Sequence, residues 1–149
     1  MGQSEFISTA DLLLAYGLLR LILGVNIAVH GVSRINLGVR SFAQGLVPLS
    51  ASTPLSPRAV YAYATALPFT ETAIGFLVFF GLESRYAYVL GLLLILSLTF
   101  GATLRQDWES AGLQLVYALT YAVLLALREY NSFSVDGWMA AIRQIGRTP

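Results

Sequence analysis

The chain has 149 residues, of which 56% are hydrophobic and 11% charged, and its formal net charge at pH 7 is +1. A soluble domain is about 25% charged, so this chain lacks the polar side chains that would cover a water-exposed surface. The small net charge argues against a nucleic-acid partner, and the absence of cysteine excludes disulfides, iron–sulfur ligation and thioether haem attachment. With a single histidine, we expect neither a metal site nor a haem.

Four hydrophobic stretches are long enough to cross a bilayer, which takes about 20 helical residues. They are residues 12–32, 60–82, 86–104 and 111–127. The last three stretches are joined by turns of a few residues, so these consecutive helices are predicted to be antiparallel neighbours. We therefore predict an all-α membrane protein, a four-helix transmembrane bundle that forms one domain over residues 1–149.

Two flanking segments are expected to lie at the membrane surface. Residues 39–47, in the long connection after the first span, mix polar with apolar side chains and are predicted to form a short interfacial helix or a cap. In the tail, Val135, Trp138, Met139 and Ile142 recur at helical spacing. This pattern predicts a short amphipathic C-terminal helix, with its tryptophan at the level of the lipid headgroups.

The arginines bear on orientation. Four spans place both termini on one side, and four arginines would then lie on each side of the membrane. Arg34, at the end of the first span, is assigned to a site rather than to a loop, which leaves the excess of positive charge with the termini. Because cytoplasmic loops carry that excess, we expect both termini on the cytoplasmic side of an inner or plasma-type membrane.

Polar side chains inside the first span are the strongest functional signal. Each ionisable group costs about 2.5–3.5 kcal/mol at mid-helix, and such groups usually face the interior of the protein. The first span carries Arg20, Asn26 and His30, with Arg34 at its end. At about 100° per residue the four fall within an arc of about 120°. We expect them to face a common site.

The second and fourth spans carry further polar groups. Glu71 lies in the second span, while Gln114, Tyr117 and Tyr121 share an arc of about 60° on the fourth. Counted along their helices, Glu71 and Arg20 lie within about one turn of the same depth. An ion pair between these two residues is therefore geometrically possible.

Each of these residues has a structural alternative. Arg20 and Glu71 could form a buried pair that fixes helix register, and His30 could be a hydrogen-bonded residue at the membrane interface. Tyr117 and Tyr121 could serve packing or belong to the aromatic belt. Most of the ionisable groups lie on two helices. This concentration favours a functional site over separate polar pairs that only fix how the helices are aligned.

Three motifs in this order resemble the DoxX family. Residues 20–34 contain an arginine, a glycine and His30-Gly-Val-Ser-Arg34, similar to the family's Arg…Gly…His-Gly-x-x-Lys signature with arginine in place of lysine. Residues 68–87 are similar to the family's glutamate-containing helix and its Gly…Arg-Ala turn. Residues 131–136 resemble the Ser-Leu-Asp ending that follows the last span.

The resemblance, which extends over residues 20–136, implies a four-helix membrane protein linked to quinone chemistry, similar to the small subunit of thiosulfate:quinone oxidoreductase. A quinone would be the bound substrate, and a small reduced sulfur compound such as thiosulfate would supply electrons. A second protein subunit or a homo-oligomer would complete the enzyme. His30, Glu71 and Arg34 are the expected catalytic residues. The residues expected to bind substrate or quinone are Arg20, Asn26, Gln114, Tyr117 and Tyr121.

Two other functions remain open. The chain could be a non-catalytic binding or assembly protein for a redox or thiol-homeostasis complex, which predicts tightly packed polar pairs and no cleft. It could be a transporter that uses Glu71 and Arg20, which predicts a water-filled path and oligomerisation. A quinone site predicts a lipid-accessible cleft beside His30, with a tyrosine hydroxyl within hydrogen-bond reach.

Overall fold

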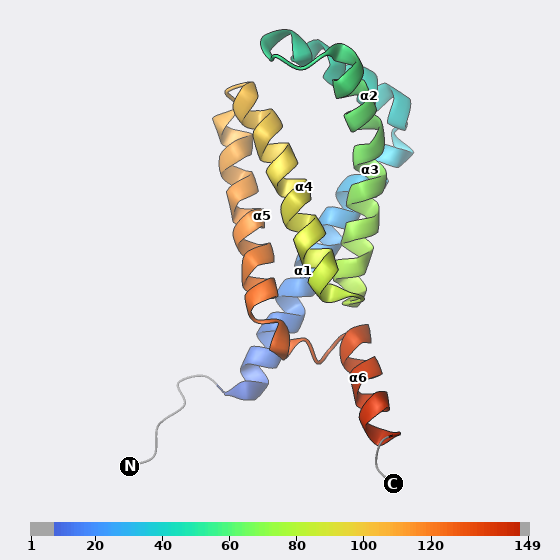
Figure 1. Ribbon diagram of the computed structural model, residues 1–149, viewed down its shortest axis with the longest axis vertical. Coiled ribbons are helices and arrows are strands. Elements are labelled where there is room, and N and C mark those ends of the chain that lie inside the picture. The colour runs from blue at the N-terminus through green and yellow to red at the C-terminus, as the bar shows by residue number, and fades with distance from the viewer. Residues whose placement is uncertain (1–7, 147–149) are drawn as a thin grey trace, which may run out of the picture.

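The computed structural model describes residues 8–146, and within these residues the regular structure is entirely helical. Four helices are long and apolar enough to cross a membrane (Figure 1). They are α1 (Thr9–Asn36), α3 (Pro57–Phe80), α4 (Ser84–Leu104) and α5 (Trp108–Ala126). The structure thus confirms the predicted transmembrane bundle and supports a multi-pass membrane protein.

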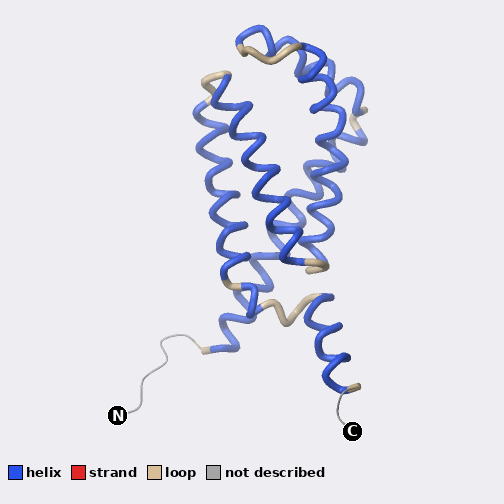
Figure 2. Tube along the Cα trace, viewed as in Figure 1, coloured by secondary structure: helices blue, strands red, loops and turns tan. Residues whose placement is uncertain are grey.

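Short helices flank the bundle at its two ends. At one end, α2 (Val39–Leu46) and the 3-10 helix η1 (Val47–Ser52) cover the bundle, and we call this the cap end. At the other end lie the 3-10 helix η2 (Arg128–Tyr130) and α6 (Val135–Ile145). We call it the terminal end, because both described ends of the chain lie there (Figure 2). The predicted interfacial segment and the predicted C-terminal helix are both present.

Capping residues set where several helices begin. A serine or aspartate side chain accepts a hydrogen bond from a backbone N–H in the first turn of α1, α3, α5 and α6. These capping residues are Ser8, Ser56, Asp107 and Ser134. Hydrophobicity alone marks only the lipid-facing length, which is why α1 is longer at both ends than the predicted residues 12–32.

Glycines allow the helices to pair closely. A Cβ atom at Gly75 of α3 would lie 2.3 Å from the backbone nitrogen of Ala28 in α1, and one at Gly31 would lie 2.4 Å from the carbonyl oxygen of Pro68. In the other pair, a Cβ at Gly91 of α4 would lie 2.2 Å from the Tyr121 ring of α5. Such close approach is typical of small residues between membrane helices. The bundle therefore consists of an α1–α3 pair and an α4–α5 pair.

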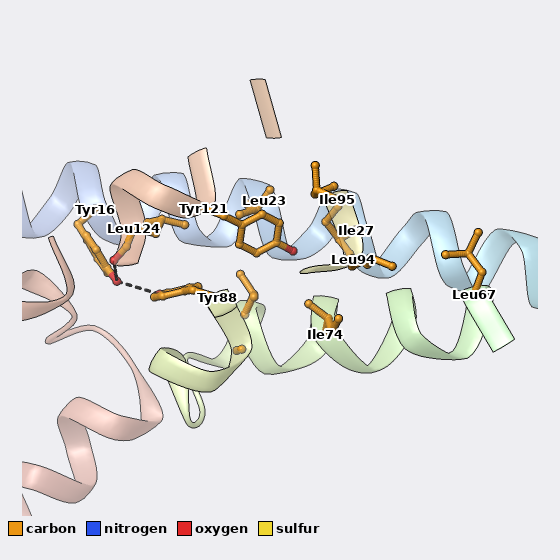
Figure 3. Close-up of a cluster of buried hydrophobic side chains, with 12 residues drawn as sticks. Tyr16, Leu23, Ile27, Leu67, Ile74, Tyr88, Leu94, Ile95, Tyr121 and Leu124 are labelled. Atoms are coloured by element: carbon orange, nitrogen blue, oxygen red, sulfur yellow. Dashed lines mark hydrogen bonds between the residues drawn. The ribbon is translucent and has the colours of Figure 1, made fainter. Parts of the chain in front are cut away.

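The two pairs share a core that lies mostly toward the terminal end (Figure 3). Its polar centre is Tyr16, whose hydroxyl lies 2.8 Å from the Tyr88 hydroxyl and donates to the Leu124 carbonyl at 3.0 Å. Tyr88 and Leu124 are fully buried. These bonds join α1, α4 and α5 at one level, and the space between the pairs lies nearer the cap.

Candidate functional site

A cavity of about 500 Å³ lies between the two helix pairs at the cap end. Its walls come from α3, α4, α5 and Arg34 of α1, and α2 and η1 cover it; most of the lining is apolar. Its polar side chains include Arg34, Tyr63, Ser97, Arg105 and Gln114. An apolar cavity of roughly 300–1,000 Å³ with a few polar groups is the usual form of a small-molecule site.

Arg34 connects three elements at this cavity. Its guanidinium forms a salt bridge with Glu71 of α3, whose side chain is only 5% exposed. The same guanidinium lies 4.9 Å from the centre of the Phe42 ring on α2, a cation–π contact. Glu71 thus pairs with Arg34 rather than with Arg20, the partner that depth along the helices had made possible. Two of the three predicted catalytic residues lie in direct contact.

Three buried polar atoms near the cavity have no hydrogen-bond partner among the described residues. They are Oε2 of Glu71, Oε1 of Gln114 and the hydroxyl oxygen of Tyr121. Gln114 lines the cavity directly, and Glu71 follows the lining residue Leu67 by one turn of α3. Sequence analysis had singled out all three residues, and the structure places them on the inward faces of α3 and α5.

Arg20 lies at the opposite end of the bundle from this cavity. It is 3% exposed and donates hydrogen bonds to the carbonyls of Val78 at 2.9 Å, of Phe79, and of Phe133 at 2.6 Å. Its guanidinium therefore ties the last turn of α3 to the segment before α6. The role in quinone binding predicted for Arg20 stays a prediction, and the observed contacts are with backbone of the same chain.

Asp136 completes this terminal connection. Its carboxylate accepts hydrogen bonds from the backbone N–H groups of Glu83 at 2.9 Å and Ser84 at 2.8 Å, and so caps α4. These bonds stabilise the start of α4, where the Glu83 side chain makes no capping hydrogen bond and the Glu83 backbone is left-handed, with φ of 48°. The segments that carry the three motifs therefore meet here, at the turn between α3 and α4.

His30 and Asn26 lie outside the cavity. Both are on the exposed face of α1, and the Tyr117 hydroxyl of α5 donates to Oδ1 of Asn26 at 3.1 Å. His30 is not among the residues that line the cavity. The structure thus places the cavity beside Arg34, one turn further along α1, and the catalytic role of His30 remains a prediction.

Sequence reasoning missed most of the lining, including Tyr63, Ser97 and Arg105. Tyr63 forms a hydrogen bond of 2.7 Å with Ser97 of α4 at the cavity wall. Tyr63 lies about two turns before Glu71 on α3, but it is exposed where Glu71 is buried, so helical spacing gives no signal for it. Arg105 lines the cavity from the turn after α4. It lies outside the predicted spans, so a search for polar residues within the spans does not find it.

Comparison with known proteins finds no matching family model, no similar curated protein and no similar solved structure. The resemblance to the DoxX family therefore stays a prediction. A function for the chain rests on the cavity, its charged pair and the chemistry these groups can perform.

Proposed function

We propose that this chain is the quinone-binding membrane subunit of an oxidoreductase, and that the cavity at the cap end holds the quinone head group. The observation that carries the proposal is a mostly apolar cavity between membrane-spanning helices, with Arg34 in its wall and that residue's salt bridge to the buried Glu71. A quinone joins an apolar ring and tail to two carbonyl oxygens, which matches this lining.

The polar groups of the cavity suit quinone reduction. Reduction places negative charge on the quinone oxygens, and preformed hydrogen-bond donors in a water-poor site stabilise such charge strongly. Arg34 and Arg105 supply donors in the cavity wall. Phe42 and Phe100 add aromatic surface for the ring. The electrons would come from a small reduced sulfur compound such as thiosulfate, through a second subunit.

Filling the cavity tests the proposal. Gly101 lines the cavity and a Cβ there would meet no atom within 4 Å, so Gly101→Phe places a ring in the cavity without a clash in the helix. Binding of the short-chain quinone ubiquinone-1 to the protein in nanodiscs should weaken about tenfold or more, since the ring occupies the ligand's volume. Equilibrium binding of the radiolabelled quinone gives the dissociation constant.

A matched control is available on the neighbouring helix. Gly112 of α5 is exposed, does not line the cavity, and a Cβ there would also meet nothing within 4 Å. Gly112→Phe should therefore leave binding unchanged. Equal weakening by both substitutions, or no saturable binding by the unaltered protein, would refute the proposed quinone site.

A second candidate function is favoured by α6. This helix extends beyond the bundle (Figure 1), with Trp138 66% and Ile145 73% exposed. Exposed apolar residues of this kind often mark an interaction surface. The chain would then be a non-catalytic assembly protein for a redox or thiol-homeostasis complex. This candidate predicts no quinone binding in the same assay, which separates it from the first.

A further inference from the structure

Gln114, which lines the cavity, and Glu71 and Tyr121, which lie just beyond its lining, carry hydrogen-bonding atoms that no described residue satisfies. Glu71 lies about four turns from the start of α3, and Tyr121 nearly four turns from the start of α5, two helices that run in the same direction. Both residues therefore lie at about the same depth. In Figure 3 the Tyr121 hydroxyl points away from Tyr16 and toward the end where Leu67 lies, which lines the cavity.

Two of the unsatisfied atoms are acceptors. The salt bridge uses Oε1 of Glu71 and supplies the counter-charge that an ionised carboxylate needs in a membrane, while Oε2 is buried and has no partner among the described residues. An ionised carboxylate oxygen can only accept a hydrogen bond. The buried Oε1 of Gln114 is likewise an acceptor, and the Tyr121 hydroxyl can accept or donate.

Buried acceptors favour an occupant that donates. A quinone has only carbonyl oxygens, which would face the Glu71 oxygen with lone pairs on both sides, whereas the reduced quinol carries two O–H donors. We infer that the inner end of this cavity recognises the hydroxyl groups of the reduced ligand, so that the site binds quinol more tightly than quinone. The inference rests on the proposed function and adds to it which redox form the site prefers.

The preference can be measured directly on the full chain. Binding of ubiquinone-1 and of its quinol to the protein in nanodiscs, under argon, should show a dissociation constant about tenfold lower for the quinol, which corresponds to roughly one hydrogen bond to a charged group. Equal constants for the two forms, or a lower constant for the quinone, would overturn the inference and leave the proposed quinone site intact. Binding of neither form would overturn both.

Glu71→Gln sharpens the test, because it can keep an oxygen on Arg34 and presents an amide donor where Oε2 stood. The ratio of the two dissociation constants should fall about tenfold, so that the two forms bind about equally. Glu109→Gln, the same change at an exposed residue in the first turn of α5, should leave the ratio as it is. If Glu71→Gln does not fold, Gln114→Leu removes the other acceptor and should lower the ratio. An unchanged ratio in the variant that folds overturns the inference.

Discussion

Each end of the bundle has an arginine of α1 facing inward, Arg20 fully buried and Arg34 partly buried, and the two make different contacts. At the terminal end Arg20 donates to carbonyls of its own chain, and its neighbour Asn131 donates to the Ser84 hydroxyl at 2.7 Å. Arg20 Nε and Asn131 Oδ1 have no hydrogen-bond partner among residues 8–146, but other hydrogen bonds fix each residue. At the cap end Arg34 meets a carboxylate beside a cavity. A charged group in a membrane helix therefore indicates an inward-facing position, and its partner distinguishes a structural role from a site.

Replacing each arginine by lysine tests this comparison and carries the largest expected effect. Arg20→Lys should lower the free energy of unfolding by about 2–4 kcal/mol, because one ammonium cannot reach three carbonyls and buried acceptors are left unsatisfied. Glu71 contacts only one guanidinium nitrogen of Arg34, so a lysine ammonium can replace that contact. Arg34→Lys should therefore lower the free energy of unfolding by less than about 1 kcal/mol. Unfolding in mixed detergent micelles measures both.

Quinone binding provides a second measurement on Arg20→Lys. Folded Arg20→Lys protein should bind ubiquinone-1 as the unaltered protein does, since Arg20 lies far from the cavity. Equal losses of stability in the two variants would show that the two ends do not differ in the way described.

Asp136→Asn probes the terminal connection with a smaller effect. An amide offers one acceptor oxygen in place of two and no charge, so the cap on α4 is weakened. We expect a loss of about 1 kcal/mol in stability and faster proteolysis within α6, followed by mass spectrometry. Asp11→Asn, at an exposed residue in the first turn of α1 that accepts a hydrogen bond from the Ser8 hydroxyl, is the matched substitution and should leave proteolysis within α6 unchanged.

The smallest expected effect is a pH dependence at the cap end. Hydrogen bonds from the side chain and the backbone N–H of Ser110 lower the pKa of Asp107 below its usual range. The folded state therefore gains stability from the ionised carboxylate above the ordinary pKa of aspartate, and loses it as the pH falls through the lowered value. Thermal unfolding between pH 6 and about pH 3 should show a decline that Asp107→Asn diminishes. An identical decline in the variant would assign it to other groups.

The sequence predicted the elements better than their partners. Span length, hydropathy and helical spacing identified the four spans, the cap segment and α6, because these properties are local. The partner of Glu71 depends on how α1 crosses α3, and residue counting yields depth but no tilt. Residue counting placed Arg20 at the depth of Glu71, but Gly24 packs against Phe79 and Gly31 against Thr72, so Glu71 lies level with the last turns of α1, near Arg34.

The same reasoning explains the placement of His30. The polar arc on α1 straddles the boundary between its packed and exposed faces, so Arg20 and Arg34 face inward while Asn26 and His30 are exposed. The packed face is marked by glycines such as Gly31, whose close approach to α3 requires a hydrogen in place of a side chain. Weighting those glycines above the polar residues would have placed His30 on the outside.

The terminal connection has a consequence for which substitutions the chain can accept. Arg20 binds carbonyl oxygens at positions 78, 79 and 133, and Asp136 binds the N–H groups at positions 83 and 84. Every amino acid supplies a backbone carbonyl, and every one except proline supplies an N–H. In a saturation mutagenesis screen, the exposed recipient positions 83 and 133 should therefore tolerate more residues than the buried positions 78 and 84, and proline should be excluded at 83 and 84.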